Sequence, residues 1–193
     1  MGLKVADALL VDLDGTLVET GEANFQAYAA ALREAGVEVD RLRFDELSRG
    51  RNWRDFLPLL LAGTDASPAT VAARKAALYG DFLHLTSLNP GVVRLIELSR
   101  AHWRCAVVTT ASRRNAEAIL RYHGLEHLFD RVVTGDDISR HKPDPEAYRL
   151  AAQELGAHPE NCVAIEDTDI GAASATAFGA AVIRVQPILS RVA

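Results

Sequence analysis

Near its beginning the chain reads Leu9-Leu10-Val11-Asp12-Leu13-Asp14-Gly15-Thr16, a short apolar run that ends in two carboxylates and a glycine turn. Side chains at positions i and i+2 of an extended chain point to the same side. If the run is a strand of a parallel sheet, Asp12 and Asp14 lie together at its carboxyl end, where such sheets bind ligands. Taken alone, the pair is equally compatible with a solvated strand end.

Four more apolar runs follow, and together with the first they predict a sheet. Each run is bounded by turn residues and is short enough for a strand buried on both faces. The five runs are Ala8–Val11, Cys105–Thr109, Arg131–Thr134, Cys162–Ile165 and Ala181–Val185. Segments with a helical spacing of apolar residues accompany the later runs, at Gly91–Ala101, Arg114–His123, Pro145–Leu155 and Ile170–Phe178. This alternation predicts an α/β fold with a doubly wound, Rossmann-like parallel sheet.

A long insertion interrupts the alternation after the first strand. About ninety residues separate the first strand from the second, far more than an ordinary crossover helix needs. The inserted segment, Thr20–Leu85, is rich in Ala and Leu, and the spacing of its apolar residues predicts a small helical bundle. We therefore expect an α/β core formed by residues 1–17 and 86–193, and an α-helical cap formed by residues 18–85. The turn residues Asn89-Pro90-Gly91 suggest a hinge where the insertion ends.

The composition restricts the classes of partner. The chain has 193 residues, a formal net charge of −5, and no apolar run of the roughly 18 residues that a membrane span requires. A net negative charge argues against a general nucleic-acid binder, because binding a phosphate backbone requires a concentrated basic surface. Residues 1–6 lack the apolar stretch of a signal peptide, so we expect a cytoplasmic protein. We also expect it to act as a monomer. Cys105 and Cys162 lie in apolar runs and are assigned no chemistry.

Polar residues follow three further strands of the predicted sheet. The second strand ends in Thr109-Thr110-Ala111-Ser112, just before a helix whose free N–H groups favour an anion. After the third comes His141-Lys142-Pro143-Asp144-Pro145, in which prolines stiffen the chain around a lysine, and the fourth ends in Glu166-Asp167. Each segment alone has an ordinary explanation, such as a helix N-cap or a solvated lysine. Because the carboxyl ends of parallel strands meet at one edge, we expect all of them to converge with Asp12 and Asp14 on one crevice.

The charge of this crevice predicts a bound cation. It combines four carboxylates, two from the first strand end and two from the fourth, with the single amine of Lys142. Two like charges about 4 Å apart repel by about 4 kcal/mol even at an effective dielectric of 20. Hard oxygen ligands of this kind suit Mg²⁺ better than zinc. With the ion bound, Lys142 and Thr110 are suited to holding an incoming phosphate.

These segments resemble the motifs of the haloacid dehalogenase-like phosphohydrolases, which are Asp-x-Asp-x-Thr, then Ser or Thr after an apolar strand, then Lys, then an acidic pair. The matching residues here are Asp12, Asp14, Thr16, Thr110, Lys142, Glu166 and Asp167. The helical insertion, Thr134-Gly135-Asp136-Asp137 and Lys142-Pro143-Asp144-Pro145 are most similar to the subgroup that holds β-phosphoglucomutase and the CbbY-type sugar-bisphosphate phosphatases. Dehalogenases and phosphonatases of the superfamily lack an acid equivalent to Asp14, so the resemblance implies action on phosphate esters.

The resemblance implies a Mg²⁺-dependent phosphatase of a small phosphorylated metabolite, either a sugar phosphate or a bisphosphate. Asp12 would attack phosphorus to form an aspartyl-phosphate, and Asp14 would protonate the leaving oxygen and later activate water. The phosphate-binding residues that it implies are Thr110, Ala111 and Lys142. The metal ligands that it implies are the carboxylates of Asp12, Glu166 and Asp167, together with the backbone carbonyl of Asp14.

Substrate choice is expected to depend on the cap. Its most polar segment is Ser48-Arg49-Gly50-Arg51-Asn52-Trp53-Arg54, whose three arginines suit a distal phosphate or sugar hydroxyls. Arginines on a helix face are more often simply solvated. The candidate substrate contacts are Glu19, Asn24, Arg51 and Arg54.

Three other functions remain open. A β-phosphoglucomutase-like isomerase is the main alternative, but members of that group usually carry His where Asn24 stands. A phospho-receiver module has similar residues, yet it places its acidic pair on the first strand and has no helical insertion of this size. A catalytically silent binding protein on the same fold is the third, although every motif position here holds a chemically competent residue.

Overall fold

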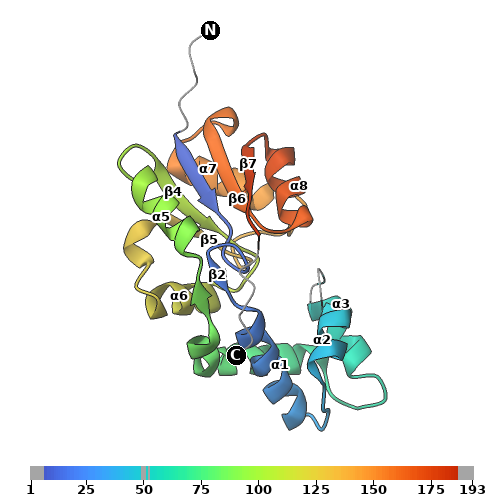
Figure 1. Ribbon diagram of the computed structural model, residues 1–193. Coiled ribbons are helices and arrows are strands. Elements are labelled where there is room, and N and C mark those ends of the chain that lie inside the picture. The colour runs from blue at the N-terminus through green and yellow to red at the C-terminus, as the bar shows by residue number, and fades with distance from the viewer. Residues whose placement is uncertain (1–6, 49–50, 52, 187–193) are drawn as a thin grey trace. The chain divides into compact units, whose positions relative to one another are not determined.

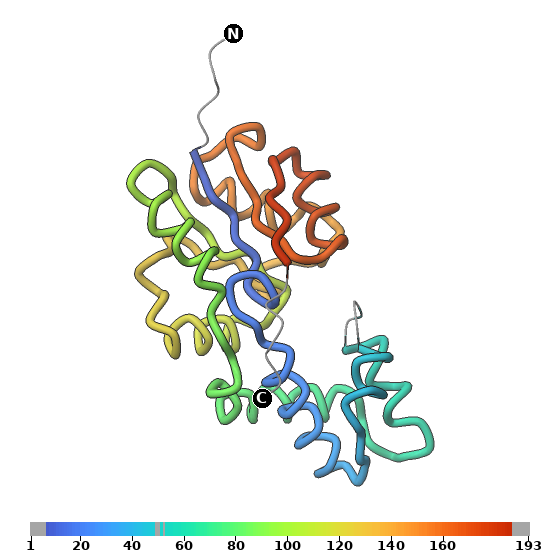
Figure 2. The backbone as a smooth tube through the Cα atoms, viewed as in Figure 1, coloured from blue at the N-terminus to red at the C-terminus, as the bar shows by residue number. Residues whose placement is uncertain are grey.

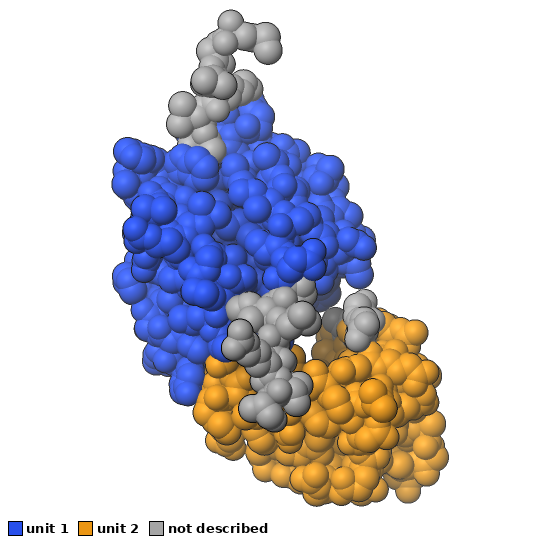
Figure 3. All heavy atoms as spheres, in the orientation of Figure 1, with its two compact units in different colours: residues 1–19, 87–193 blue, residues 20–86 orange. Residues whose placement is uncertain are grey.

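The computed structural model describes residues 7–48, 51 and 53–186. The chain divides into two compact units, of which unit 1 comprises Met1–Glu19 and Ser87–Ala193, and unit 2 comprises Thr20–Thr86 (Figure 3). The backbone trace in Figure 2 shows the chain leaving unit 1 once and returning to it once. Among the described residues, no helix combines the length and the apolar character that crossing a bilayer requires.

Unit 1 is built on a five-stranded parallel sheet with the strand order β5-β4-β1-β6-β7 (Figure 1). The strands are β1 (Ala8–Val11), β4 (Arg104–Val108), β5 (Arg131–Val133), β6 (Cys162–Glu166) and β7 (Ala181–Arg184). Ala8 pairs with Arg104 of β4 on one side and with Cys162 of β6 on the other. All four residues of β1 are buried, as a central strand covered on both faces requires. The predicted doubly wound parallel sheet is confirmed, and the predicted strand ends differ by at most one residue.

The helices of unit 1 begin and end where local chemistry favours it. They are α5 (Pro90–Ser99), α6 (Arg113–Tyr122), α7 (Glu146–Leu155) and α8 (Asp169–Phe178), with short 3-10 turns at Glu126–Leu128 and Pro159–Asn161. Asn89, Ser112 and Thr168 cap α5, α6 and α8 by accepting hydrogen bonds from backbone N–H groups of the first turn. Gly156 and Gly179 end α7 and α8 with positive φ angles of 67° and 102°.

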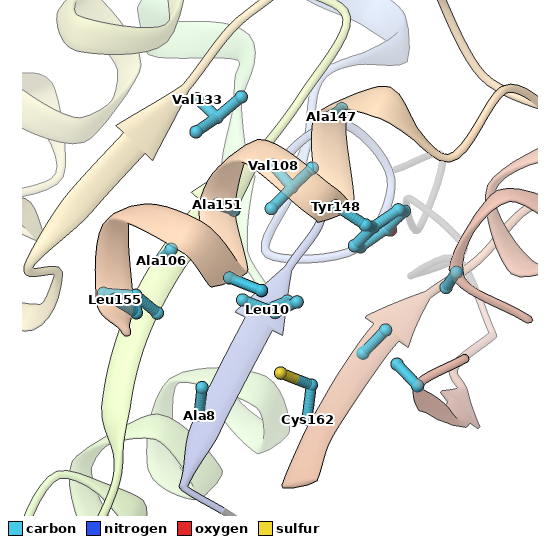
Figure 4. Packing of buried hydrophobic residues seen from close by; sticks show 14 residues of the cluster. Ala8, Leu10, Ala106, Val108, Val133, Ala147, Tyr148, Ala151, Leu155 and Cys162 are labelled. Carbon is cyan, nitrogen blue, oxygen red and sulfur yellow. The ribbon is translucent and has the colours of Figure 1, made fainter. Parts of the chain in front are cut away.

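Helix α7 contributes more residues than any other element to the described apolar cluster on the sheet. It contacts β1, β4 and β5, and it also packs against α8. Figure 4 shows Ala147, Tyr148, Ala151 and Leu155 of α7 beside the strand residue Leu10, and all of them are buried. Alanines on this face let the helix approach the sheet closely, while Tyr148 fills the space near the strand ends.

A two-stranded antiparallel ladder lies where unit 1 gives way to the insertion. Its strands are β2 (Val18–Glu19) and β3 (Ser87–Leu88), and Val18 pairs with Leu88. The Asn89 N–H also donates to the Leu17 carbonyl at 2.9 Å. The residues Asn89-Pro90-Gly91 form the start of α5, because Pro90 suits a first helical turn and Asn89 caps it. The hinge expected there stays a prediction.

Unit 2 is helical and has a core of its own. Its elements are α1 (Gly21–Glu34), α2 (Arg41–Ser48), α3 (Trp53–Leu60), α4 (Pro68–Leu78) and the 3-10 segment η1 (Tyr79–Leu85). Four aromatic rings, those of Phe25, Tyr28, Phe44 and Phe56, meet with centroids 5.2 to 5.7 Å apart. Tilted and edge-on contacts of this kind add to the stabilisation from burial.

Candidate functional site

The first strand carries Asp12 to the edge of the sheet and then turns sharply. The Asp12 N–H still donates to the Ile165 carbonyl of β6 at 3.0 Å, and its side chain is largely buried. Gly15 then adopts a φ of 84°, and its N–H donates to the Val18 carbonyl at 2.8 Å. A side chain at position 15 would collide with Asp167, since a Cβ there would lie 2.4 Å from Oδ2. Glycine therefore permits both the turn and the close approach of Asp167.

Lys142 joins the carboxylates of two strands. Its Nζ donates to Asp12 Oδ1 at 2.7 Å, to Glu166 Oε1 at 2.6 Å and to the Val108 carbonyl at 3.0 Å. The side chains of Lys142 and Glu166 are only 7% and 1% exposed. The predicted convergence of these strand ends is therefore present in the fold, with the lysine at its centre.

Hydroxyl groups also hold the two acids at the end of β6. Thr16 Oγ1 donates to Asp167 Oδ1 at 3.0 Å, and Tyr148 OH donates to Glu166 Oε1 at 2.6 Å. Sequence reasoning did not identify Tyr148, because a tyrosine on the apolar face of a helix is normally a core residue. Burial, with the Glu166 charge, keeps the pKa of Tyr148 above its ordinary value, so the phenol stays protonated and donates.

Burial and like charges make the acidic cluster electrostatically costly. Burial raises the pKa of Asp12 to about 8, with Glu166 and Asp14 acting in the same direction and Lys142 against them. Burial also raises the pKa of Asp167, with the Thr16 hydrogen bond opposing the rise. The pKa of Lys142 is raised despite its burial, because Asp12 and Glu166 favour its charged form. A cation beside the acids would favour their ionised forms.

Three of these acids are suited to holding that cation. Asp12, Glu166 and Asp167 each offer a carboxylate oxygen, and these atoms lie within 4.8 Å of one another. An all-oxygen donor set of carboxylates fits Mg²⁺, which binds proteins through a few carboxylates and keeps room for water and substrate oxygens. The Asp14 carboxylate is outside this group, and a contribution of Asp14 through its backbone carbonyl stays a prediction.

The Asp14 carboxylate is instead near the end of β4. Thr109 Oγ1 donates to Asp14 Oδ2 at 3.3 Å and accepts from the Ala111 N–H at 3.0 Å. Thr109 is buried, whereas Thr110, the predicted phosphate-binding residue, is exposed at the strand end. Gly135 packs against this turn, because a Cβ there would lie 2.5 Å from the Thr110 carbonyl oxygen. Sequence reasoning missed Thr109, because the alternation of a strand does not distinguish two adjacent threonines at its end.

The candidate substrate residues belong to both units. Glu19 lies in β2 of unit 1, whereas Asn24, Arg51 and Arg54 belong to unit 2. Arg51 Nη1 donates to the Leu47 carbonyl at 3.3 Å, and the Arg54 guanidinium lies 4.5 Å from the centre of the Trp53 ring. Arg49, Gly50 and Asn52 of the same segment lie outside the described residues.

Unit 2 also contains a buried lysine that sequence reasoning missed. Lys75 is 8% exposed, and its Nζ donates to Asn24 Oδ1 at 2.6 Å. The amine lies 4.3 Å from the centre of the Tyr79 ring and 5.0 Å from that of Tyr28. A lysine among helical alanines reads as an exposed residue in the sequence, and only the packing of α1 against α4 and η1 buries it.

Known proteins match the chain over nearly its whole length. The family model of the haloacid dehalogenase-like hydrolases matches residues 6–179. The fructose-1-phosphate phosphatase YqaB of Escherichia coli (strain K12) is 32% identical over 173 residues, which cover 89% of this chain and 92% of YqaB.

Solved structures give the same result. A crystal structure of CbbY from Rhodobacter sphaeroides in complex with phosphate matches with a TM-score of 0.85 and 31% identity, covering 98% of this chain and 90% of CbbY. A second, of a CbbY mutant with xylulose-(1,5)bisphosphate, matches with the same score and identity and covers 97% and 89%. The resemblance predicted from the motifs is confirmed. The chain belongs to the haloacid dehalogenase-like hydrolases.

Proposed function

We propose that this protein is a Mg²⁺-dependent phosphatase that hydrolyses small phosphorylated sugars through an aspartyl-phosphate on Asp12. The observation that carries the proposal is the contact of Lys142 Nζ with Asp12 and Glu166 at 2.7 and 2.6 Å, beside the Asp167 carboxylate. An amine and a carboxylate cluster at the ends of parallel strands suit phosphoryl transfer, which depends mainly on positioning and charge stabilisation. The sugar-phosphate class is supported by the names of YqaB and of the CbbY complex.

The two aspartates of the first motif would divide the chemistry. An Asp12 oxygen attacks phosphorus and the bond from phosphorus to the sugar oxygen breaks, while Asp14 gives its proton to that oxygen. Water then attacks the phosphoaspartate and Asp14 takes its proton, so that inorganic phosphate leaves and Asp12 is regenerated. The Thr109 hydroxyl, 3.3 Å from Asp14 Oδ2, orients the Asp14 carboxylate for both proton transfers.

The other residues of the site would hold charge in place. Lys142, with Thr110 and the Ala111 N–H, would bind the transferred phosphoryl group. Asp12, Glu166, Asp167 and the Asp14 carbonyl would hold Mg²⁺, which when bound neutralises the acids and stabilises charge on the phosphoryl oxygens. Buried charges of this kind are held in position before substrate arrives, so little reorganisation is needed during the reaction.

Unit 2 would act as the cap that selects the sugar. Its polar groups include Asn24, hydrogen-bonded to Lys75, and the exposed Arg51. Closure of such an insertion would exclude water from the reacting phosphate. In this proposal Glu19, Asn24, Arg51 and Arg54 contact the part of the substrate that is not transferred.

The test is Mg²⁺-dependent phosphate release from a panel of sugar phosphates and bisphosphates, with the wild type and Asp12→Asn. The wild type should release phosphate, and Asp12→Asn should be inactive because an amide cannot serve as the nucleophile. Equal activity of the two proteins would exclude the aspartyl-phosphate. Interconversion of sugar 1- and 6-phosphates without net phosphate release would favour an isomerase instead.

A further inference from the structure

The Glu166 carboxylate lies in a pocket formed by three different contacts. Lys142 Nζ and Tyr148 OH both donate to Oε1 at 2.6 Å, and the Thr168 hydroxyl is 3.4 Å from Oε2. Gly171 closes the pocket, because a Cβ there would lie 2.0 Å from Oε1 and 2.1 Å from Oε2. Two donors thus bind Oε1 of Glu166, and the backbone of Gly171 packs closely against the carboxylate.

The Tyr148 hydroxyl has a role separate from the packing of its ring. The ring is fully buried in the cluster of α7 and the sheet, and in Figure 4 it extends from α7 toward the carboxyl end of β6. Its centre also lies 5.1 Å from Lys142 Nζ. A phenylalanine would keep the apolar contacts and the contact with the lysine, so the hydroxyl alone accounts for the bond to Glu166.

The hydrogen bonds from Lys142 and Tyr148 to Glu166 Oε1 have different roles. Lys142 also donates to Asp12 and to the Val108 carbonyl, so its position depends on three acceptors and does not by itself fix the plane of the Glu166 carboxylate. Tyr148 approaches from a helix that packs on the sheet, and its hydroxyl donates to Glu166 Oε1. Groups that orient a metal-binding carboxylate in this way commonly change metal affinity by about 10- to 100-fold when they are removed.

We propose that Tyr148 is a positioning residue of this site, whose hydroxyl holds the Glu166 carboxylate in the orientation that binds the divalent cation. The inference rests on the proposed function for its metal, and it adds a residue outside the sequence motifs. Tyr148 itself contacts neither the cation nor the substrate, and it acts through Glu166.

The experiment compares the wild type, Tyr148→Phe and the control Tyr122→Phe, which removes the same hydroxyl from a half-exposed ring on α6. Mg²⁺ binding is measured by titration calorimetry without substrate, and thermal unfolding is measured with and without Mg²⁺. Tyr148→Phe should raise the Mg²⁺ dissociation constant about 10-fold or more and reduce the Mg²⁺-induced rise in unfolding temperature. Tyr122→Phe should match the wild type in both measurements.

A second variant, Gly171→Ala, changes the position of the Glu166 carboxylate by a different contact. Gly171→Ala should also raise the Mg²⁺ dissociation constant, because its Cβ displaces Glu166. A Tyr148→Phe protein that unfolds at a lower temperature but binds Mg²⁺ as the wild type does would overturn the proposal and leave Tyr148 a structural residue. The phosphatase proposal fails separately, if the wild type binds Mg²⁺ but releases no phosphate, and the calorimetric comparison still decides the role of Tyr148.

Discussion

Lys142 shows how one residue determines the electrostatics of the site. Its amine forms ion pairs with both Asp12 and Glu166, and both carboxylates are nearly excluded from water. A buried ion pair contributes little net stability, but removing one partner leaves the other charge uncompensated. We therefore expect the lysine to stabilise the fold in addition to its proposed role in phosphate binding.

Lys142→Met should lower the free energy of unfolding by about 3 kcal/mol. It should also lower the rate of phosphate release by about 100-fold or more. Since Mg²⁺ would offset the same carboxylates, the loss of stability should shrink when Mg²⁺ is added. Urea unfolding with and without Mg²⁺ measures both effects. Arg94→Met, which breaks an exposed pair with Glu97 on α5, is the control and should change stability by less than about 0.5 kcal/mol.

Gly15 is a second residue whose replacement should affect the site directly. Gly15→Ala introduces strain of about 1 to 2 kcal/mol because of the positive φ, and its Cβ pushes on Asp167. Gly124→Ala is the control, because Gly124 also has a positive φ, of 67°, but a Cβ there meets no atom within 4 Å. Gly15→Ala should lose at least as much stability in urea as Gly124→Ala, and only Gly15→Ala should bind Mg²⁺ more weakly. Equal Mg²⁺ affinity in the two would contradict the role given to Gly15.

The loop between β5 and α7 is the element that brings Lys142 to the sheet. Glu146, at the start of α7, accepts hydrogen bonds from the Ser139 N–H at 3.0 Å and the Arg140 N–H at 2.9 Å. Asp144 Oδ1 in turn accepts from the Glu146 N–H at 2.9 Å. These bonds close the loop on either side of Lys142 without involving the lysine.

The pKa of Glu146 makes this loop sensitive to acid. The Ser139 backbone hydrogen bond, with further bonds from Arg140 and the Ser139 hydroxyl, lowers the pKa of Glu146 from 4.5 to about 2. The ionised form therefore stabilises the fold above pH 4.5, and this contribution is lost as the pH falls toward 2. Glu146→Gln should reduce the loss of stability between pH 5 and about 2, as measured by urea midpoints at each pH. An unchanged profile would show that Glu146 does not hold the loop.

At the level of elements, the sequence predicted most of what is found. The apolar runs fixed the five strands to within a residue, because a strand covered on both faces must be apolar throughout. The hinge expected at Asn89-Pro90-Gly91 stays a prediction, and the same residues form the start of α5. Local composition cannot choose between a turn and the first turn of a helix.

The division into two units has consequences for the whole molecule. Unit 2 has an aromatic core of its own, and unit 1 has an apolar cluster of its own on the sheet. Regions with separate cores open separately, and hydrogen exchange reports such local opening.

Phe56→Ala should destabilise unit 2 by about 3 to 5 kcal/mol, because the ring is buried against Tyr28 and Phe44. Native-state hydrogen exchange should accelerate in α1 and α4, while the amides of β1 and β6 keep their wild-type protection. Leu59→Ala, at a half-exposed position of the same helix, is the control and should leave both sets unchanged. Equal acceleration in the sheet would show that the two units unfold together.

Family membership also decides among the functions that the sequence left open. A phospho-receiver module is excluded, because the chain matches the haloacid dehalogenase-like hydrolases over residues 6–179. The position at which β-phosphoglucomutase-like isomerases usually carry His holds Asn24 here, and Asn24 accepts a hydrogen bond from Lys75.

The sequence by itself determined the parallel sheet, the inserted helices and the motif residues Asp12, Asp14, Lys142, Glu166 and Asp167, because periodicity and turn chemistry are local properties. Only the tertiary structure decided that Thr109 faces Asp14, that Tyr148 holds Glu166 and that Lys75 is buried against Asn24. These partners are 95, 18 and 51 positions apart in the chain. Their contacts depend on the direction in which buried side chains point once helices and strands have packed. A local sequence pattern does not determine that direction.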